Sequence, residues 1–368
     1  MRKYKVGIIG CGAICGNYLG YARNAYADYF TVTRLGDLNV EKAKARAEKY
    51  EIPQYGTPDL VYDDPEIDLI INLTVPMAHE EITLRALEAG KHVYSEKPLS
   101  ASREGMKRII ETAKRVGKRV GCAPDSFMSA PAQTAKKALE EDWIGAPIGA
   151  NAMCAMRGNE YWRPDADFFY HKGAGPMMDM APYYLNLFIS LLGPVGSVST
   201  MSKITWGERT IKVPPRRGEK IAVEVPTYVA STLKFDCGVI ASFTNSFDIW
   251  HTQQPFMEIY GEKGTMVIPN PNVYKGDVLI RRFADTEWRV VPQFVEYQDY
   301  GRGIGVVDMI RCIETGEPHK ASAEMAYHTT DVILAMDEAG DAQREVDIAS
   351  TTVKPEGLWN SPETILWK

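Results

Sequence analysis

The stretch Lys5–Gly16, KVGIIGCGAICG, predicts the fold of the first third of the chain. Its apolar run ends in glycines, as a buried parallel strand does before a tight turn. Helical periodicity follows over 13–26, so the stretch predicts a strand, a turn and a helix. Gly10 and Gly12 permit close backbone approach to a ligand, and the positive end of the following helix favours a pyrophosphate group.

Strand-like and helix-like segments continue to alternate after this stretch. We expect further strands at 31–35, 68–73, 92–95 and 119–123, and helices at 40–50, 79–89 and 103–116. Strict alternation implies parallel crossovers and a doubly wound α/β sheet. We therefore predict a dinucleotide-binding Rossmann domain over residues 1–123.

Asp37 follows the second predicted strand and supports a dinucleotide ligand. Its carboxylate would accept hydrogen bonds from ribose hydroxyls and repel a 2′-phosphate. Leu38 and Asn39 come next, with no arginine, so the sequence favours NAD over NADP. The alternative is that Gly10–Gly16 is only a strand–helix turn and that Asp37 caps the next helix.

Residues 124–368 have a different pattern. A predicted helix at 132–141 leads into an aromatic loop at 157–175, and alternating β-like runs follow from 197 to 282. We predict an α+β domain over 124–368 with a large, mainly antiparallel open sheet. Two domains are also what a chain of 368 residues favours. The basic segment 212–220 is expected to be a solvated hairpin loop.

Composition excludes several classes of protein. A net charge of −6 argues against nucleic-acid or anionic-membrane partners. The N-terminal apolar run is too short for a secretory leader, and nothing approaches the roughly 20 apolar residues of a membrane span. The six cysteines are scattered, which is typical of reduced thiols in a cytoplasmic protein. The histidines have no metal-ligand spacing, so no metal site is expected.

Two segments carry candidate chemistry. Lys97 follows the fourth predicted strand, where ligands of open α/β sheets bind, although on its own it could be a surface lysine in a turn. Asp179 and Tyr183 lie four residues apart in a predicted helix, and therefore on one face. Lysine, aspartate and tyrosine are groups that a hydride-transfer site needs beside a substrate hydroxyl.

At these residues the chain resembles the Gfo/Idh/MocA oxidoreductases, named after glucose–fructose oxidoreductase, inositol dehydrogenase and a rhizopine-catabolism protein. The resemblance covers nearly the whole length. Its motifs are the glycine turn, TVPMAH at 74–79, EKP at 96–98, the GxGxxxDxxxY segment at 173–183, YGEKGT at 260–265 and the late helix at 321–336.

The resemblance implies a role for each matching residue. The cofactor would be bound by Gly10, Gly12 and Asp37 at its adenosine half, with Thr74, Pro76 and His79 along it and Glu96 and Lys97 at the nicotinamide. Ala13 and Ile14, which follow Gly12, are also expected to bind the cofactor. Lys97 and Asp179 would contact the reacting hydroxyl of a sugar, a polyol or a glycoside. The resemblance also implies a homo-oligomer, a dimer or a tetramer, assembled through the second domain.

Tyr183 stands where most members of that family have histidine. An ordinary phenol stays protonated at neutral pH, so it cannot serve as a base unless its pKa is lowered. An ammonium ~4 Å away would stabilise the phenolate by about 4 kcal/mol at an effective dielectric constant of ~20. We therefore hypothesise an acid–base pair of Tyr183 and Lys97, oriented by Asp179. Tyr184 competes for this role, but the family register favours Tyr183.

The aromatic loop supplies candidate substrate-binding residues. Aromatic rings and hydrogen-bond donors suit a sugar, and a packed aromatic loop is the competing interpretation. The candidates are Arg157, Tyr161, Trp162, Arg163 and His171, with Tyr184 on the following helix.

The preferred function is an NAD-dependent dehydrogenase acting on a secondary hydroxyl. One alternative is a glycosidase or lyase that cycles a bound NAD through a 3-keto sugar. A second, from another class, is a non-catalytic sensor of a sugar or NAD.

Overall fold

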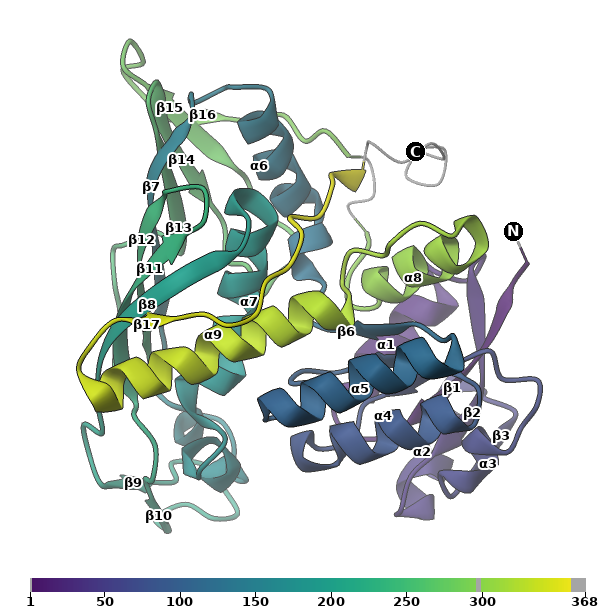
Figure 1. Ribbon diagram of the computed structural model, residues 1–368. Coiled ribbons are helices and arrows are strands. Elements are labelled where there is room, and N and C mark those ends of the chain that lie inside the picture. The colour runs from purple at the N-terminus through teal and green to yellow at the C-terminus, as the bar shows by residue number, and fades with distance from the viewer. Residues whose placement is uncertain (1, 296–298, 359–368) are drawn as a thin grey trace. The chain divides into compact units, whose positions relative to one another are not determined.

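The computed structural model describes residues 2–295 and 299–358, which form two compact units (Figure 1). The first unit consists of the described residues of Met1–Ser129 and Tyr297–Thr330, and the second consists of the described residues of Ala130–Glu296 and Asp331–Lys368. The sequence analysis assigned the whole of 124–368 to a second domain. The difference arises because the backbone of 303–305 is hydrogen bonded to Asp125 of the first unit.

The first unit contains a six-stranded sheet within the described residues, and every pair of neighbouring strands is parallel. The order is β3-β2-β1-β4-β5-β6. The strands are β1 (Tyr4–Ile9), β2 (Phe30–Gly36), β3 (Gln54–Gly56), β4 (Leu69–Asn72), β5 (His92–Ser95) and β6 (Val120–Cys122). All four residues of β4 are buried, as expected of a central parallel strand. The predicted doubly wound fold is confirmed.

Helices connect these strands. They are α1 (Cys15–Arg23), α2 (Val40–Tyr50), α3 (Asp59–Tyr62), α4 (His79–Glu88) and α5 (Arg103–Val116), with the 3₁₀ turn η1 (Pro76–Ala78) before α4. The 3₁₀ turn η2 (Ser126–Met128) follows β6, and α8 (Ile304–Thr315) joins this unit from later in the chain. Helix α1 is shorter than the predicted 13–26 because turns occupy 24–29.

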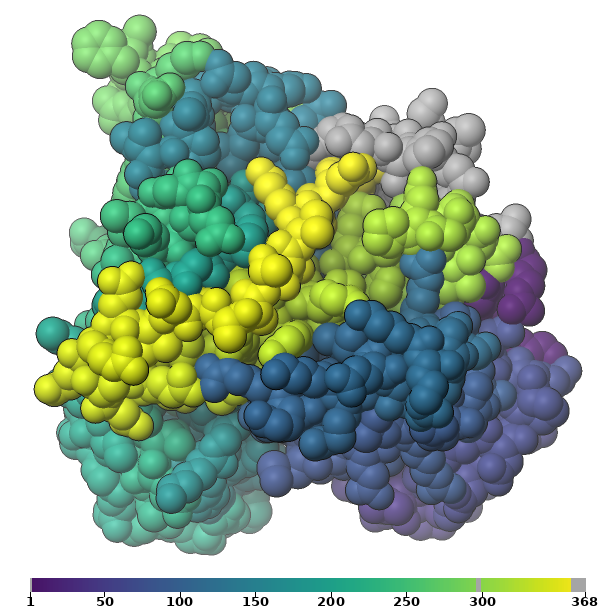
Figure 2. Space-filling view, in the orientation of Figure 1, coloured from purple at the N-terminus to yellow at the C-terminus, as the bar shows by residue number. Residues whose placement is uncertain are grey.

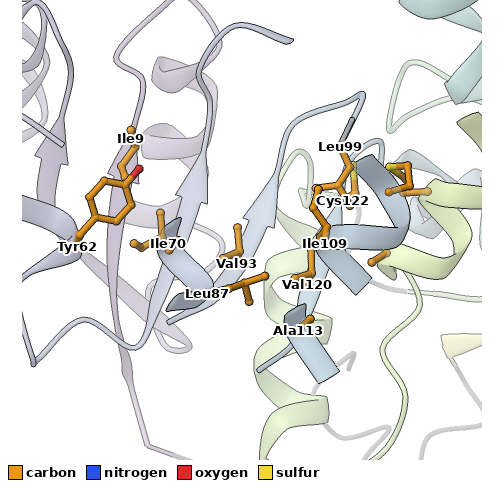
Figure 3. Packing of buried hydrophobic residues seen from close by; sticks show 14 of the residues in the cluster. Ile9, Tyr62, Ile70, Leu87, Val93, Leu99, Ile109, Ala113, Val120 and Cys122 are labelled. Atoms are coloured by element: carbon orange, nitrogen blue, oxygen red, sulfur yellow. The ribbon is translucent and has the colours of Figure 1, made fainter. Parts of the chain in front are cut away.

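Helix α5 illustrates how sequence pattern becomes packing. Its N-cap Ser102 accepts a hydrogen bond from the Gly105 N–H, which satisfies one of the free donors at the helix start. The buried face carries Met106 and Ile109, which pack with Val93 of β5 in the core cluster of Figure 3. The opposite, charged face is exposed, and α5 is visible as dark blue surface in Figure 2.

The second unit contains a nine-stranded sheet within the described residues, in the order β16-β15-β14-β13-β7-β12-β11-β8-β17. Only the β7–β12 pair is parallel, so the predicted mainly antiparallel sheet is confirmed. The strands are β7 (Pro147–Ala155), β8 (Val195–Lys203), β11 (Tyr228–Phe235), β12 (Ile240–Ser246), β13 (Met257–Gly261), β14 (Gly264–Ile268), β15 (Leu279–Arg282), β16 (Arg289–Val290) and β17 (Val346–Asp347).

A separate antiparallel pair, β9 (Glu208–Thr210) and β10 (Lys220–Ala222), forms the predicted hairpin around the basic segment 212–220. The remaining elements of this part of the chain are α6 (Ala130–Glu140), α7 (Gly175–Leu192), α9 (Ala323–Ala342), η3 (Asn159–Tyr161) and η4 (Ala166–Tyr170).

The two faces of the large sheet differ. Helix α7 packs on one of them, where Tyr184 stacks on Phe243 with ring centroids 5.4 Å apart. Along β12, buried and exposed residues alternate over 240–243, as expected of a sheet with one covered face. The other face exposes large apolar side chains, among them Ile148, Met201 and Ile240.

Candidate active site

The glycine turn after β1 has one closed side and one open side. Gly10 has a φ of +100°, and a Cβ placed there would lie 2.5 Å from the Leu73 carbonyl oxygen, so β1 can approach the end of β4 only with glycine at this position. A Cβ at Gly12 would meet nothing within 4 Å. Ala13 is exposed and Ile14 half-buried on the same turn. This open side fits the diphosphate of a dinucleotide.

Asp37 joins the glycine turn to the end of β2. One carboxylate oxygen accepts the Cys11 N–H at 2.8 Å, and the other accepts the Asn39 N–H at 2.8 Å. Asn39, rather than Asp37, is the N-cap residue of α2. A carboxylate offers about four acceptor sites, so Asp37 keeps capacity for the ribose hydroxyls of the predicted cofactor.

Arg46 of α2 was missed in the sequence analysis. Its Nη2 donates to the Gly12 carbonyl oxygen at 3.0 Å, which places a cation against the turn. Arg46 lies nine residues after Asp37, beyond Leu38 and Asn39, the positions on which the cofactor preference was based. The buried Ala43 and Ala47 form the inner face of α2, and Arg46 is next to Ala47 in the sequence. The small apolar residues at 43 and 47 were the pattern from which this placement of Arg46 could have been predicted.

The loops after β4 and β5 are connected by His79. Its Nδ1 lies 2.7 Å from the Pro98 carbonyl oxygen and its Nε2 lies 3.1 Å from the Thr74 carbonyl oxygen. Burial lowers the pKa of His79, and the side chain is almost inaccessible. The sequence analysis expected His79 to lie along the cofactor. Its contacts fix the two loops that carry Thr74 and Lys97, and its place along the cofactor stays a prediction. Pro76 begins the short helix η1.

Glu96 and Lys97 follow β5. The Glu96 carboxylate is nearly buried and accepts the Tyr18 hydroxyl at 3.0 Å and the Lys97 N–H at 3.2 Å. Because β1, β4 and β5 are neighbours in the sheet, their carboxyl ends bring the glycine turn, Thr74 and Lys97 to one edge. Ligands of open α/β sheets bind at this edge. The donors, the open glycine turn and the acidic residue after β2 fit a dinucleotide.

Helix α7 carries the second group of candidates. It begins at Gly175, with Pro176 in its first turn, and it places Asp179 and Tyr183 on one face. Asp179 is half-buried and Tyr183 is buried. Tyr184 is 1% exposed, and its hydroxyl donates to the Met153 carbonyl oxygen at 3.4 Å. Packing against the sheet accounts for Tyr184.

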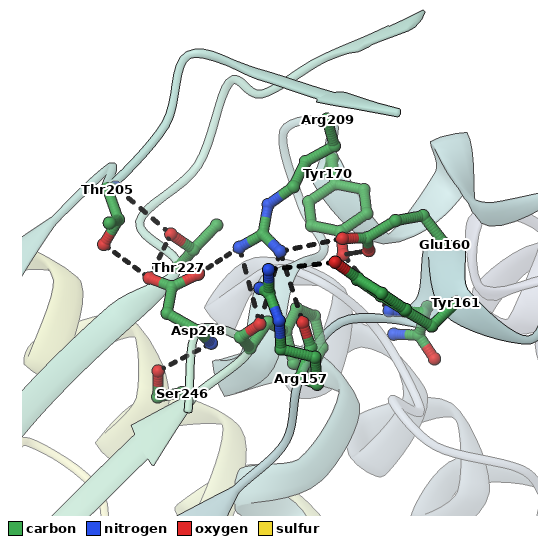
Figure 4. A network of polar contacts seen from close by, with 11 residues as sticks. Arg157, Glu160, Tyr161, Tyr170, Thr205, Arg209, Thr227, Ser246 and Asp248 are labelled. Carbon is green, nitrogen blue, oxygen red and sulfur yellow. Dashed lines mark hydrogen bonds and ion pairs between the residues drawn. The ribbon is translucent and has the colours of Figure 1, made fainter. Parts of the chain in front are cut away.

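A buried ionic network underlies the aromatic loop (Figure 4). Arg209 of β9 lies between two carboxylates, with its Nη1 2.9 Å from Glu160 and its Nη2 in contact with Asp248. The Tyr170 hydroxyl donates to Glu160 and accepts the Asn159 N–H. The sequence analysis missed Arg209, Glu160 and Asp248, since they come from three separate segments.

Arg157 lies on aromatic rings beside this network. Its guanidinium carbon is 3.9 Å from the centroid of the Trp250 ring and 4.8 Å from that of Tyr161. Its Nη2 donates to the Tyr161 hydroxyl at 2.9 Å. Trp250 remains largely exposed, so this stack presents an aromatic surface as well as packing.

The other loop candidates have local partners. Arg163 makes two hydrogen bonds to Asp165, and His171 lies 3.2 Å from Glu224. Trp162 is about half exposed. Arg163 and His171 are therefore held by neighbouring carboxylates on the surface of their unit.

Among residues 2–295 and 299–358, every helix is too short or too polar to span a membrane. No group of three or more His, Cys, Asp or Glu side chains there is arranged to hold a metal ion.

Comparison with known proteins gives the chain its family. Residues 4–123 match the model of the Gfo/Idh/MocA oxidoreductase family with an NAD-binding Rossmann fold, and residues 132–267 match a C-terminal domain model of the same family. Inositol 2-dehydrogenase of Paracoccus denitrificans is 26% identical, covering 94% of this chain and 97% of that protein. D-xylose dehydrogenase of Paenarthrobacter nicotinovorans is 21% identical, covering 86% of each.

The fold also matches solved structures. Levoglucosan dehydrogenase in complex with NADH superposes with a TM-score of 0.82 at 21% identity, over 95% of this chain and 100% of that one. With both domain models matched in order along the sequence, the chain belongs to the Gfo/Idh/MocA family of NAD-binding oxidoreductases.

Proposed function

We propose that the protein is an NAD-dependent dehydrogenase that oxidises a secondary hydroxyl of a sugar, a polyol or a glycoside, or reduces the corresponding ketone. The observation that carries this proposal is the sheet edge at which β1, β4 and β5 present the glycine turn, Thr74 and Lys97. Related proteins named as dehydrogenases of inositol and xylose support the substrate class.

The proposed chemistry follows the hypothesised acid–base pair of Tyr183 and Lys97. A bound nicotinamide supplies the hydride acceptor. Tyr183 takes the proton of the reacting hydroxyl, and the ammonium of Lys97 stabilises the phenolate that results. Asp179, one helical turn before Tyr183, orients the hydroxyl and the tyrosine. Glu96 lies beside Lys97 and places a negative charge at the nicotinamide end.

Cofactor selection is assigned to the glycine turn and Asp37. The open side at Gly12 receives the diphosphate, and the Asp37 carboxylate accepts the ribose hydroxyls. A 2′-phosphate carries between one and two negative charges near neutral pH and is repelled by Asp37. NAD is therefore preferred to NADP.

We assign substrate binding and oligomerisation to the second unit. Arg157, Tyr161 and Trp250 supply an aromatic and donor surface for a sugar. Ile148 and Ile240 lie exposed on adjacent strands of the large sheet, and Met201 is exposed on the same sheet. Exposed apolar groups on a sheet support a homo-oligomer formed through this sheet.

The test begins with the purified protein and identifies any bound dinucleotide by mass spectrometry. Inositols, pentoses, anhydrosugars and glycosides are then added with NAD while the absorbance of reduced nicotinamide is followed. We expect at least one polyol to produce NADH. Lys97→Met and Tyr183→Phe should abolish turnover, whereas the control Tyr184→Phe should retain most of it.

Other outcomes have distinct meanings. Release of an aglycone without accumulation of NADH would replace the dehydrogenase with the redox-cycling reaction. Binding of NAD without turnover of any polyol would favour a sensor. Full turnover by Tyr183→Phe would refute the proposed acid–base pair.

A further inference from the structure

A glycine-rich segment from the distant end of the sequence belongs to the first unit. The Gly303 and Gly305 N–H groups donate to one oxygen of Asp125, at 3.0 and 2.9 Å. The Tyr26 hydroxyl accepts the Gly301 N–H at 2.9 Å and donates to the Gly301 carbonyl oxygen at 2.6 Å. Asp125 is 1% exposed, so this segment is anchored to the interior of the unit.

The glycines let the segment lie close to the sheet and to α1. A Cβ at Gly301 would overlap the ring of Tyr21, and one at Gly305 would overlap the hydroxyl of Tyr94. The sequence YGRGIG at 300–305 is thus built for close backbone contact. Arg302 is the one charged residue within it.

Arg302 is held beside the Glu96 carboxylate. Its Nη1 lies 3.7 Å from the Glu96 oxygen that also accepts the Tyr18 hydroxyl. The side chains of Arg302 and Glu96 are 16% and 11% exposed, so little of the ion pair is in contact with water. The other Glu96 oxygen accepts the N–H of Lys97. Arg302 therefore affects the Glu96–Pro98 segment through its contact with Glu96.

We propose that Arg302 is a positioning residue that balances the charge of Glu96 and so sets the relative affinity for oxidised and reduced cofactor. This inference rests on the proposed function, since it requires Glu96 to lie at the nicotinamide end. The oxidised nicotinamide ring is cationic and the reduced ring is neutral. An uncompensated carboxylate nearby favours the oxidised form, and the Arg302 guanidinium offsets that preference.

The test measures dissociation constants of NAD⁺ and NADH by titration calorimetry. For Arg302→Gln we expect the ratio Kd(NAD⁺)/Kd(NADH) to fall about tenfold, because one unit charge is removed from a partly buried site. Glu96→Gln should raise the ratio, the double variant should return towards the wild-type value, and Arg302→Lys should stay near it. The control Arg115→Gln removes an exposed arginine of the same unit, paired with Glu88, and should leave the ratio unchanged.

The ratio separates a charge effect from a loss of structure, because both cofactor forms require the same folded unit. If Arg302→Gln does not fold, the opposite shift in Glu96→Gln still tests the charge balance. If the wild-type protein binds both cofactor forms but Arg302→Gln and Glu96→Gln leave Kd(NAD⁺)/Kd(NADH) unchanged, the inference is overturned. Failure of the wild-type protein to bind either form would instead contradict the proposed function.

Discussion

Replacement of Arg209 by methionine should strongly destabilise the second unit. Arg209, Glu160 and Asp248 have side chains that are 4%, 2% and 5% exposed. Removal of the guanidinium leaves two buried carboxylates without their counter-charge. Breaking a buried ion pair from one side costs about 3–5 kcal/mol, a large part of a typical unfolding free energy of roughly 5–15 kcal/mol.

The assay is urea unfolding followed by tryptophan fluorescence. Trp206 is a local reporter, because the Arg209 guanidinium carbon lies 4.9 Å from its ring centroid. The triple variant Arg209→Met, Glu160→Gln, Asp248→Asn should recover most of the lost free energy, since no buried charge remains.

A surface pair provides the matched control. Arg163 is paired with Asp165 at 41% side-chain exposure, so Arg163→Gln should cost under about 1 kcal/mol. A loss of about 1 kcal/mol or less for Arg209→Met, equal to that of the control, would refute the reasoning about the buried network.

Three further predictions concern the first unit. Burial lowers the pKa of His92 to about 4, so between about pH 6.5 and pH 4 the unfolded chain binds a proton that the folded chain excludes. The stability that this histidine contributes above pH 6.5 is therefore lost as the pH falls. In urea titrations at about pH 7.5 and pH 5, the wild type should lose about 1–2 kcal/mol more unfolding free energy than His92→Asn. Gly12→Val should abolish NAD binding with little change in Tm, whereas Gly10→Ala should lower Tm by several degrees. If calorimetry gave the two variants the same change in Tm and in NAD affinity, the assignment of an open side to Gly12 and a closed side to Gly10 would be contradicted. Asp37→Ser should weaken NAD binding about tenfold and improve NADP binding, and an unchanged preference in cofactor titrations would remove Asp37 from the specificity assignment.

The parts predicted from sequence are those with local signals. The strand, turn and helix around Gly10 are encoded within a dozen residues, and the alternation that follows determines a parallel sheet. The spacing of Asp179 and Tyr183 is sufficient to place them on one face of α7. The order of strands then brings the glycine turn, Thr74 and Lys97 to one edge.

The parts not predicted depend on contacts between distant residues. Asp125 binds the backbone of Gly303 and Gly305, and no local pattern connects these positions. The ion pairs of Arg209 likewise depend on how β9 lies against the aromatic loop and the end of β12. The contacts of the buried His79 with the Pro98 and Thr74 carbonyl oxygens likewise join separate loops, and the place along the cofactor that the resemblance implies for His79 stays a prediction.

The most direct test of the central claim follows the hydride itself. A polyol accepted by the enzyme is labelled with deuterium at its carbinol carbon, and the products are analysed by mass spectrometry. The account predicts that the deuterium appears at C4 of the reduced nicotinamide, and that Lys97→Met transfers none. Deuterium retained in the sugar product or lost to water would contradict net oxidation of the hydroxyl by NAD.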